Sequence, residues 1–240
     1  MVHFVGAGSG AADLITVRGA RLLGEADVVI YAGSLVNPAL LSYTKPGCEI
    51  HNSAKMTLEE VIAVIRAAEA AGKTTVRLHT GDSSIYGAVR EQFDELEALG
   101  IAYDVCPGVS AFCGAAAALK AEYTLPDVSQ TVIITRAAGR TPVPARESIR
   151  ALAAHLRTHK DYDIIHYHTA SKIGAPVCGM MRVLCPRAKI VVHSHIVYPP
   201  MTLTWRAAHL VYQLFADYFL GCGVAAGRFV FGDQIGRAHV

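Results

Sequence analysis

A glycine-containing loop between an apolar strand and a helix is the feature that most restricts how this chain can fold. Residues 80–87 read Thr-Gly-Asp-Ser-Ser-Ile-Tyr-Gly, after an apolar run at 75–79 and before a helical pattern at 88–99. The order predicts that this loop stands at the carboxyl end of a strand, where α/β sheets bind their ligands.

Two further loops of this kind follow two other predicted strands. Gly6, Gly8 and Gly10 come directly after the first apolar run, and residues 106–110 read Cys-Pro-Gly-Val-Ser. Because the carboxyl ends of parallel strands share one edge of a sheet, the three loops predict one crevice for one ligand. A dinucleotide site requires Gly-x-Gly-x-x-Gly and a later acidic residue. The different spacing here argues against NAD.

Strands and helices alternate along the whole chain, which is typical of an α/β protein with a mostly parallel sheet. The clearest helix covers 57–71, where Thr57 and Glu60 form a capping box and Gly72 stands at the C′ position. Further elements follow residue 130: strands at 131–135, 163–168, 189–194 and 218–222, and helices at 145–160, 171–184 and 202–216.

Composition describes a packed globular protein, with 52% hydrophobic and 18% charged residues. The six cysteines form no Cys-x-x-Cys pair, so a disulfide framework is not indicated and a reducing, cytoplasmic location is expected. Gln213, Asp217 and Arg228 interrupt the apolar stretch 209–231, which argues against a membrane span. The basic residues are scattered, which argues against nucleic-acid binding.

Together with other blocks, the three loops resemble the tetrapyrrole methyltransferases of corrin synthesis, and among them the precorrin-4 C11-methyltransferases. The other blocks include Asp-Leu-Ile-Thr-Val-Arg-Gly-Ala at 13–20, Ala-Asp-Val-Val-Ile-Tyr-Ala-Gly-Ser-Leu-Val at 26–36, and Val-Ser-Gln-Thr-Val-Ile-Ile-Thr-Arg at 128–136. The resemblance covers about residues 2–155. It implies an amino-terminal methyltransferase domain at 1–140. It also implies methyl transfer from S-adenosylmethionine to ring carbon C11 of precorrin-4 or cobalt-precorrin-4 in cobalamin biosynthesis, with a homodimer as a possible assembly.

The resemblance also implies roles for particular residues. Asp82 would accept hydrogen bonds in the cofactor site, and Ile85 and Tyr86 would contact the adenosyl group. Serine stands at 9 and 83, where the family usually has proline, which frees the backbone there. The implied cofactor-binding residues are Gly81, Asp82, Ile85, Tyr86, Pro107 and Ser110, and the implied substrate-binding residues are Gly6, Gly8, Gly10, Arg136 and Arg140.

Several of these roles have a plainer structural alternative. The glycines at 6–10 can form an ordinary tight βα turn. Asp82 and Ser110 can simply cap the helices that follow them. Arg136 and Arg140 can pair with carboxylate arms of a porphyrinoid, or can lie in a solvated loop. No catalytic base is assigned, because a sulfonium donor carries the reactive methyl group and the protein mainly aligns the reactants.

The last third of the chain departs from this pattern. Residues 1–155 carry 13 Lys+Arg and 16 Asp+Glu, whereas 156–240 carry 9 and 4, so the net charge changes from −3 to +5. Residues 156–233 resemble an interior slice of a family 4-like GT-B glycosyltransferase, which predicts a partial Rossmann-like βα fragment at 161–233. A helix at 141–160 would form the junction. Residues 234–240 read like a translated sequencing adapter and are expected to be a disordered tail.

This organisation suggests a chimeric chain in which methyl transfer is impaired. The alternative functions are a glycosyltransferase fragment and an inactive chimeric α/β protein. Two His-x-His pairs, at 166–168 and 193–195, are compatible with a zinc site, since alternate strand residues share a face. Histidines at strand ends facing a sugar-acceptor cleft are the interpretation preferred from the glycosyltransferase resemblance, so no metal site is assigned.

Overall fold

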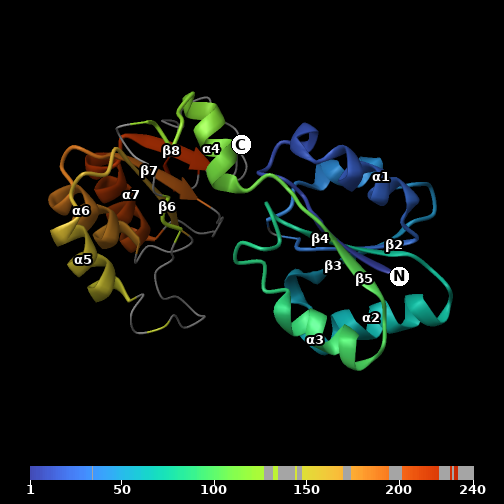
Figure 1. Ribbon diagram of the computed structural model, residues 1–240. Coiled ribbons are helices and arrows are strands. Elements are labelled where there is room, and N and C mark those ends of the chain that lie inside the picture. The colour runs from blue at the N-terminus through green and yellow to red at the C-terminus, as the bar shows by residue number, and fades with distance from the viewer. Residues whose placement is uncertain are drawn as a thin grey trace. The chain divides into compact units, whose positions relative to one another are not determined.

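The computed structural model describes most of the chain as two compact units (Figure 1). The amino-terminal unit is Met1–Gly114, and the carboxyl-terminal unit begins at Ala115. The division falls inside one helix, α4 (Ala111–Leu119), earlier than the predicted domain limit at residue 140. The described residues are 1–33, 35–126, 132–134, 144, 148–169, 174–194, 202–221, 228 and 230–231.

A five-stranded sheet organises the amino-terminal unit. Its strands lie in the order β3-β2-β4-β1-β5, and every neighbouring pair is parallel. This confirms the predicted α/β class with a parallel sheet. The strands are β1 (Val2–Gly6), β2 (Val28–Tyr31), β3 (Glu49–Asn52), β4 (Thr75–His79) and β5 (Tyr103–Cys106).

Helices cover both faces of this sheet, as a parallel sheet requires (Figure 1). On one face, α1 (Val17–Glu25) packs Leu22 and Leu23 against Val5 and Leu78. On the other face, α2 (Leu58–Ala70) and α3 (Arg90–Ala98) pack against the strand residues whose side chains point to that face. That second cluster contains Val2, Phe4, Val28, Ile30, Val61, Ile62, Ile65 and Leu96.

The first and last turns of α2 form as its sequence predicts. The Thr57 hydroxyl accepts a hydrogen bond from the Glu60 N–H at 3.3 Å, and the Glu60 carboxylate accepts one from the Thr57 N–H at 2.8 Å. Gly72 follows the helix with a φ of +67°, as a C′ glycine does.

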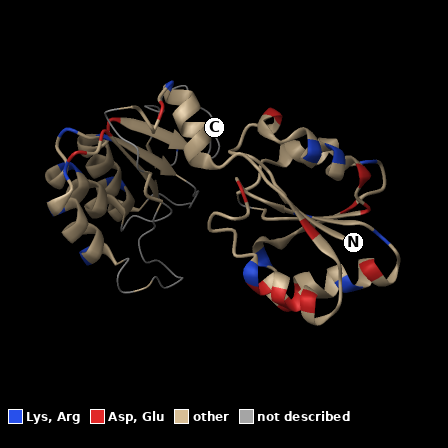
Figure 2. Cartoon of the chain, in the orientation of Figure 1, with Lys and Arg blue, Asp and Glu red and all other residues tan. Residues whose placement is uncertain are grey.

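Acidic side chains of the amino-terminal unit are concentrated on α3 (Figure 2). This helix contains Glu91, Asp94, Glu95 and Glu97.

The carboxyl-terminal unit contains a second parallel sheet, with the strand order β6-β7-β8. One face packs against three helices in a core that includes Ile190, Val192 and Tyr212. Ala115 and Leu119 of α4 pack with Ile164, Val191 and Leu220 on alternate strand positions. The elements are α5 (Ile149–Thr158), β6 (Ile164–Thr169), α6 (Gly174–Leu184), β7 (Lys189–Ser194), α7 (Leu203–Phe215) and β8 (Tyr218–Gly221).

These elements confirm the predicted βα alternation, with one exception. The predicted strand at 131–135 is wrong over 132–134, which is irregular and leaves Val132, Ile133 and Ile134 exposed. An apolar run alone does not make a strand, because a strand also needs a neighbour to pair with. The predicted tail at 234–240 lies outside the described residues.

Candidate functional site

The three glycine-containing loops meet at one edge of the amino-terminal sheet. Strand β1 lies between β4 and β5, with Gly6 beside His79 and Val5 beside Cys106. Gly8 and Gly81 form an antiparallel bridge through Gly81 N–H to Gly8 C=O (2.8 Å) and Gly8 N–H to Gly81 C=O (3.2 Å). The predicted single junction of three loops is therefore confirmed.

Glycine is required where these loops touch. A Cβ on Gly6 would lie 2.6 Å from backbone atoms of both Gly108 and Gly81, and a Cβ on Gly108 would lie 2.2 Å from the Gly81 carbonyl oxygen. Such separations are far below van der Waals contact, so Gly6 and Gly108 approach each other and Gly81 this closely only because they have no side chains. The site is thus built largely from main chain.

Asp82 joins two of the loops. Its carboxylate accepts a hydrogen bond from the Gly108 N–H at 2.9 Å and another from the Ser84 N–H at 2.8 Å. Burial alone raises the pKa of Asp82, but the bonds from the Ser84 hydroxyl, the Gly108 N–H and the Ser84 N–H outweigh it and leave the pKa below its ordinary 3.8. The carboxylate is therefore ionised at neutral pH.

The alternative that Asp82 caps the next helix is wrong. Helix α3 begins at Arg90, and its N-cap is Val89, which makes no side-chain capping bond. Asp82 instead caps the turn within its own loop, where Ile85 N–H also donates to the Asp82 carbonyl at 3.2 Å. The amino end of α3 therefore does not orient the Asp82 carboxylate.

Apolar side chains of the loops remain at the surface. Ile85 is 39% exposed and Tyr86 57% exposed, and Tyr86 has a φ of +56°, which an L-residue rarely adopts. Pro107 is also exposed. Ser110 is buried directly before α4, and its carbonyl accepts the Gly114 N–H at 3.1 Å. The structure therefore brings all six predicted cofactor-binding residues into two adjoining loops.

The predicted substrate-binding residues are only partly described. Gly6, Gly8 and Gly10 lie in the first loop, where the Gly10 carbonyl accepts a hydrogen bond from the Asn37 amide at 2.8 Å. Arg136 and Arg140 lie outside the described residues. Asn37 was not identified from the sequence, and only its position directly after the block 26–36, which contains the β2 strand, connects it with this edge.

Sequence reasoning also missed three buried polar atoms in these segments. Ser9 Oγ, His79 Nε2 and Thr80 Oγ1 are shielded from solvent and have no hydrogen-bond partner among the described residues. Leaving such an atom unsatisfied costs about 1–3 kcal/mol, so a ligand or water that supplies a partner stabilises the site. The sequence signal that could have indicated a buried polar group is His79, an ionisable residue at the end of an apolar run.

The environment keeps His79 neutral. Burial lowers its pKa to about 3, and the nearby Arg77 guanidinium contributes to the same effect. Arg77 is itself buried and donates to the Gln92 amide oxygen at 3.0 Å and to the Ile30 carbonyl at 3.1 Å. The His79 ring stacks on Phe4, with 6.0 Å between ring centroids.

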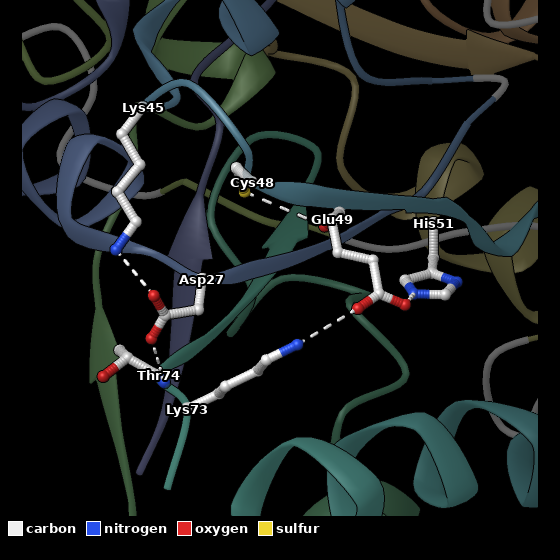
Figure 3. A network of polar contacts seen from close by, with 7 residues as sticks. All are labelled: Asp27, Lys45, Cys48, Glu49, His51, Lys73 and Thr74. Carbon is white, nitrogen blue, oxygen red and sulfur yellow. Dashed lines mark hydrogen bonds and ion pairs between the residues drawn. The ribbon is translucent and has the colours of Figure 1, made fainter. Parts of the chain in front are cut away.

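The opposite edge of the same sheet is held by ordinary ion pairs (Figure 3). Asp27 accepts from Lys45 Nζ at 2.6 Å and from the Thr74 N–H at 2.8 Å. Glu49 contacts His51 Nε2 at 2.8 Å and Lys73 Nζ at 3.6 Å. The bond from Lys45 lowers the pKa of Asp27, and the bond from His51 lowers that of Glu49. This network connects strand beginnings and is a structural feature.

In the carboxyl-terminal unit, the histidines of the two His-x-His pairs are partly described. His166, His168 and His193 lie next to one another across β6 and β7. His195 lies outside the described residues. Part of His168 reaches solvent, yet burial of its ring lowers its pKa to about 4.

The amino-terminal unit is thus an α/β fold with a parallel sheet, and its three loops meet at the carboxyl ends of β1, β4 and β5. The family model of the Tetrapyrrole (Corrin/Porphyrin) Methylases matches residues 1–176. The chain therefore belongs to the tetrapyrrole methylase family. The match continues past residue 155, where the sequence resemblance was expected to stop.

Individual relatives agree with this assignment. The chain is 58% identical over 157 residues to the cobalt-precorrin-4 C(11)-methyltransferase of Methanocaldococcus jannaschii, a match that covers 65% of this chain and 61% of that protein. It is 44% identical over 200 residues to the precorrin-4 C(11)-methyltransferase of a Sinorhizobium species, with 79% of each chain covered. The matched region thus spans about three fifths of the first relative's length.

Solved structures give the same family. A cobalt-precorrin-4 methyltransferase of cobalamin biosynthesis superposes with a TM-score of 0.64 at 40% identity, covering 78% of this chain and 74% of that one. The glycosyltransferase resemblance of residues 156–233 receives no support from these relatives, nor does the adapter interpretation of 234–240. Among the described helices, none is long and apolar enough to cross a bilayer.

Proposed function

We propose that this chain binds S-adenosylmethionine at the three-loop junction and methylates C11 of precorrin-4 or cobalt-precorrin-4 in cobalamin biosynthesis. The observation that supports the proposal is the junction itself, which lies at the carboxyl ends of parallel strands, where α/β folds commonly bind ligands. The fold is similar to that of a cobalt-precorrin-4 methyltransferase at 40% identity. The reaction would take place in the cytoplasm, in keeping with the five described cysteines, which are free thiols.

The residues present fit this cofactor. An S-adenosyl compound combines an amino-acid end, a ribose and an adenine, and so needs polar partners beside apolar surface. The junction offers buried oxygens of Ser9 and Thr80 that have no hydrogen-bond partner within the described part of the chain. It also offers main-chain groups of the glycine loops and exposed side chains at Ile85 and Tyr86. When bound, the cofactor supplies a methyl group on a positively charged sulfur.

The protein's own contribution would be binding and alignment. The ionised Asp82 carboxylate holds the loops at 80–87 and 106–110 together through Gly108, and so fixes the two cofactor loops relative to each other. Ile85 and Tyr86 would contact the adenosyl group, Pro107 and Ser110 the adenine side. Gly6, Gly8 and Gly10 would border the tetrapyrrole, whose carboxylate arms Arg136 and Arg140 would bind. No base is assigned, because alignment supplies most of the rate.

Binding of S-adenosylhomocysteine tests the cofactor part of the proposal. By isothermal titration calorimetry on the full chain, we expect one site with a dissociation constant between about 1 μM and 1 mM. Asp82→Ala and Tyr86→Ala should each weaken binding about tenfold, a loss of roughly 1.4 kcal/mol. The matched controls are Asp94→Ala on α3 and Tyr43→Ala, both at exposed positions of the same unit.

Binding that is unchanged in both Asp82→Ala and Tyr86→Ala would remove these residues from the cofactor site. Methyl transfer itself is tested by incubating the chain with S-adenosylmethionine and either precorrin-4 or cobalt-precorrin-4, followed by mass spectrometry of the tetrapyrrole. The proposal predicts a gain of one methyl group on at least one of the two substrates. Cofactor binding without methyl gain on either would restrict the function to cofactor binding.

A further inference from the structure

Three imidazole rings lie side by side on one face of the carboxyl-terminal sheet. His166 and His168 are alternate residues of β6 and so share a face, and His168 stands directly beside His193 of β7 in the strand register. The ring centroids are 4.3 Å apart for His166 and His168, 4.7 Å for His168 and His193, and 5.4 Å for His166 and His193.

The ring nitrogens are close enough to converge on one ion. One nitrogen from each of the three rings lies within 4.8 Å of the other two. Zinc binds histidine nitrogen at about 2.0–2.1 Å in tetrahedral geometry, which places two such nitrogens roughly 3.3 Å apart. The three nitrogens therefore need to approach one another by no more than roughly 1.5 Å to share one ion.

The surroundings make this cluster unusual for a sheet face. The same face carries Ile164, Val191 and Leu220, which pack against Ala115 and Leu119 of α4. A bound metal ion would take one nitrogen of each of the three rings as a ligand on this face.

The cluster also has an access route. His193 is completely buried, whereas His168 reaches solvent near the carboxyl end of β6. An ion can enter on the His168 side, and a solvent molecule can occupy a fourth position there. The carboxyl end of parallel strands is also where α/β sheets bind ligands.

We propose that His166, His168 and His193 form a binding site for a divalent first-row transition metal ion, with Zn²⁺ as the ion it takes. Imidazole suits zinc, copper and nickel, and does not suit magnesium or calcium, which prefer oxygen ligands. Three protein nitrogens leave one position open for water. The site lies wholly in the carboxyl-terminal unit and does not depend on the proposed methyl transfer.

A second pair of histidines in the same unit also offers nitrogen ligands, and the experiment must distinguish that pair from the three-histidine cluster. His155 and His159 stand one turn apart on and just after α5, with ring centroids 4.3 Å apart. This pair offers two ligands instead of three, and His155 Nε2 already contacts the Tyr162 hydroxyl at 2.5 Å. His159→Gln removes the second pair and leaves the three-histidine cluster intact.

The test is Zn²⁺ titration of the full chain after removal of metals with a chelator. We expect one Zn²⁺ per chain by calorimetry, no binding of Mg²⁺, and visible absorption bands on addition of Co²⁺ as a spectroscopic substitute. His168→Gln should weaken Zn²⁺ binding by roughly 100-fold or more, since even residues that only support metal ligands account for 10–100-fold. His159→Gln should leave the affinity unchanged.

His168→Gln is the primary variant because His168 is partly exposed, and His193→Gln serves as the second. Circular dichroism and the fluorescence of Trp205, the one tryptophan of the chain, show whether each variant keeps its fold. Zn²⁺ binding that persists in a folded His168→Gln variant, or that is lost in His159→Gln, would overturn the proposal. So would an unmodified chain that binds no Zn²⁺.

Discussion

The two parallel sheets of this chain present different chemistry at equivalent places. At the carboxyl edge of the amino-terminal sheet, the backbones of Gly6 and Gly108 lie so close to each other and to Gly81 that neither has room for a Cβ. Near the carboxyl end of the β6–β7 pair, side chains dominate, and His166 and His193 stack at 5.4 Å. The carboxyl edge of a parallel sheet can thus present either closely packed main chain at glycines or a cluster of side chains.

The difference determines how each site responds to substitution. A site built from backbone tolerates no added Cβ, because the atoms it would strike belong to other loops and cannot rotate away. A site built from side chains loses one ligand at a time, and the fold around it remains. The predictions below use this contrast, beginning with the largest expected effect.

The largest effect is expected for Gly6→Ala. The added Cβ would lie 2.6 Å from Gly108 and Gly81 backbone atoms, so one of the three loops must move. We expect a loss of about 3 kcal/mol or more in the free energy of unfolding, as for severe overpacking, together with loss of S-adenosylhomocysteine binding. Urea denaturation followed by circular dichroism measures the first, and calorimetry the second.

Gly24→Ala is the matched control for that change. Gly24 lies within α1, and a Cβ there meets its nearest atom at an ordinary 3.5 Å. Alanine should be neutral or stabilising by up to about 1 kcal/mol, because it is the better helix former. Equal losses in both variants would show that the loop junction is no more tightly packed than a helix surface.

A smaller effect is expected from protonation of His79. Its pKa is about 3 in the folded chain and about 6.5 when unfolded, so the unfolded chain binds more protons between these values. The His79 contribution to stability is complete above pH 6.5 and is lost as the pH falls toward 3. Linkage gives a loss on the order of 2 kcal/mol by pH 4.5, an acidic destabilisation that His79→Gln should reduce.

Denaturation midpoints measured at intervals from pH 7.5 to pH 4.5 check this, with His51→Gln as the control. His51 lies on the opposite edge of the sheet, beside Glu49. A stability profile of identical slope in the original chain and in His79→Gln would contradict the burial of a neutral imidazole at the end of β4.

The smallest effect is expected at the amino ends of the strands. Asp27→Asn removes the ion pair with Lys45 and weakens the acceptor for the Thr74 N–H. Because these groups are at the surface, the thermal midpoint should fall only slightly at low salt, and the difference should shrink at 1 M NaCl. A salt-independent drop as large as that of Gly6→Ala would contradict the distinction between the two edges.

The sequence was most informative where backbone geometry decides the structure. Glycines after apolar runs predicted the meeting of loops 6–10, 80–87 and 106–110, and the capping box predicted the start of α2. These signals are local, because the residue type alone determines whether a Cβ is present and whether a positive φ is readily adopted.

Features that depend on packing were not predictable in this way. The buried Nε2 of His79, which has no hydrogen-bond partner among the residues that the structure describes, depends on how the end of β4 packs. The three-histidine cluster needs the register that places His168 beside His193, and spacing along one strand does not give it. The division between units falls inside the alanine-rich α4, where no Pro/Gly/Ser linker marks it.

The central claim is that the cofactor occupies the backbone-built junction of the amino-terminal unit. Hydrogen–deuterium exchange of the full chain, with and without saturating S-adenosylhomocysteine, tests it most directly. The account predicts slower exchange in peptides covering 6–10, 80–87 and 106–110, and unchanged exchange in peptides covering 164–169 and 189–194. Protection confined to the two β6 and β7 peptides, or no protection at saturation, would contradict it.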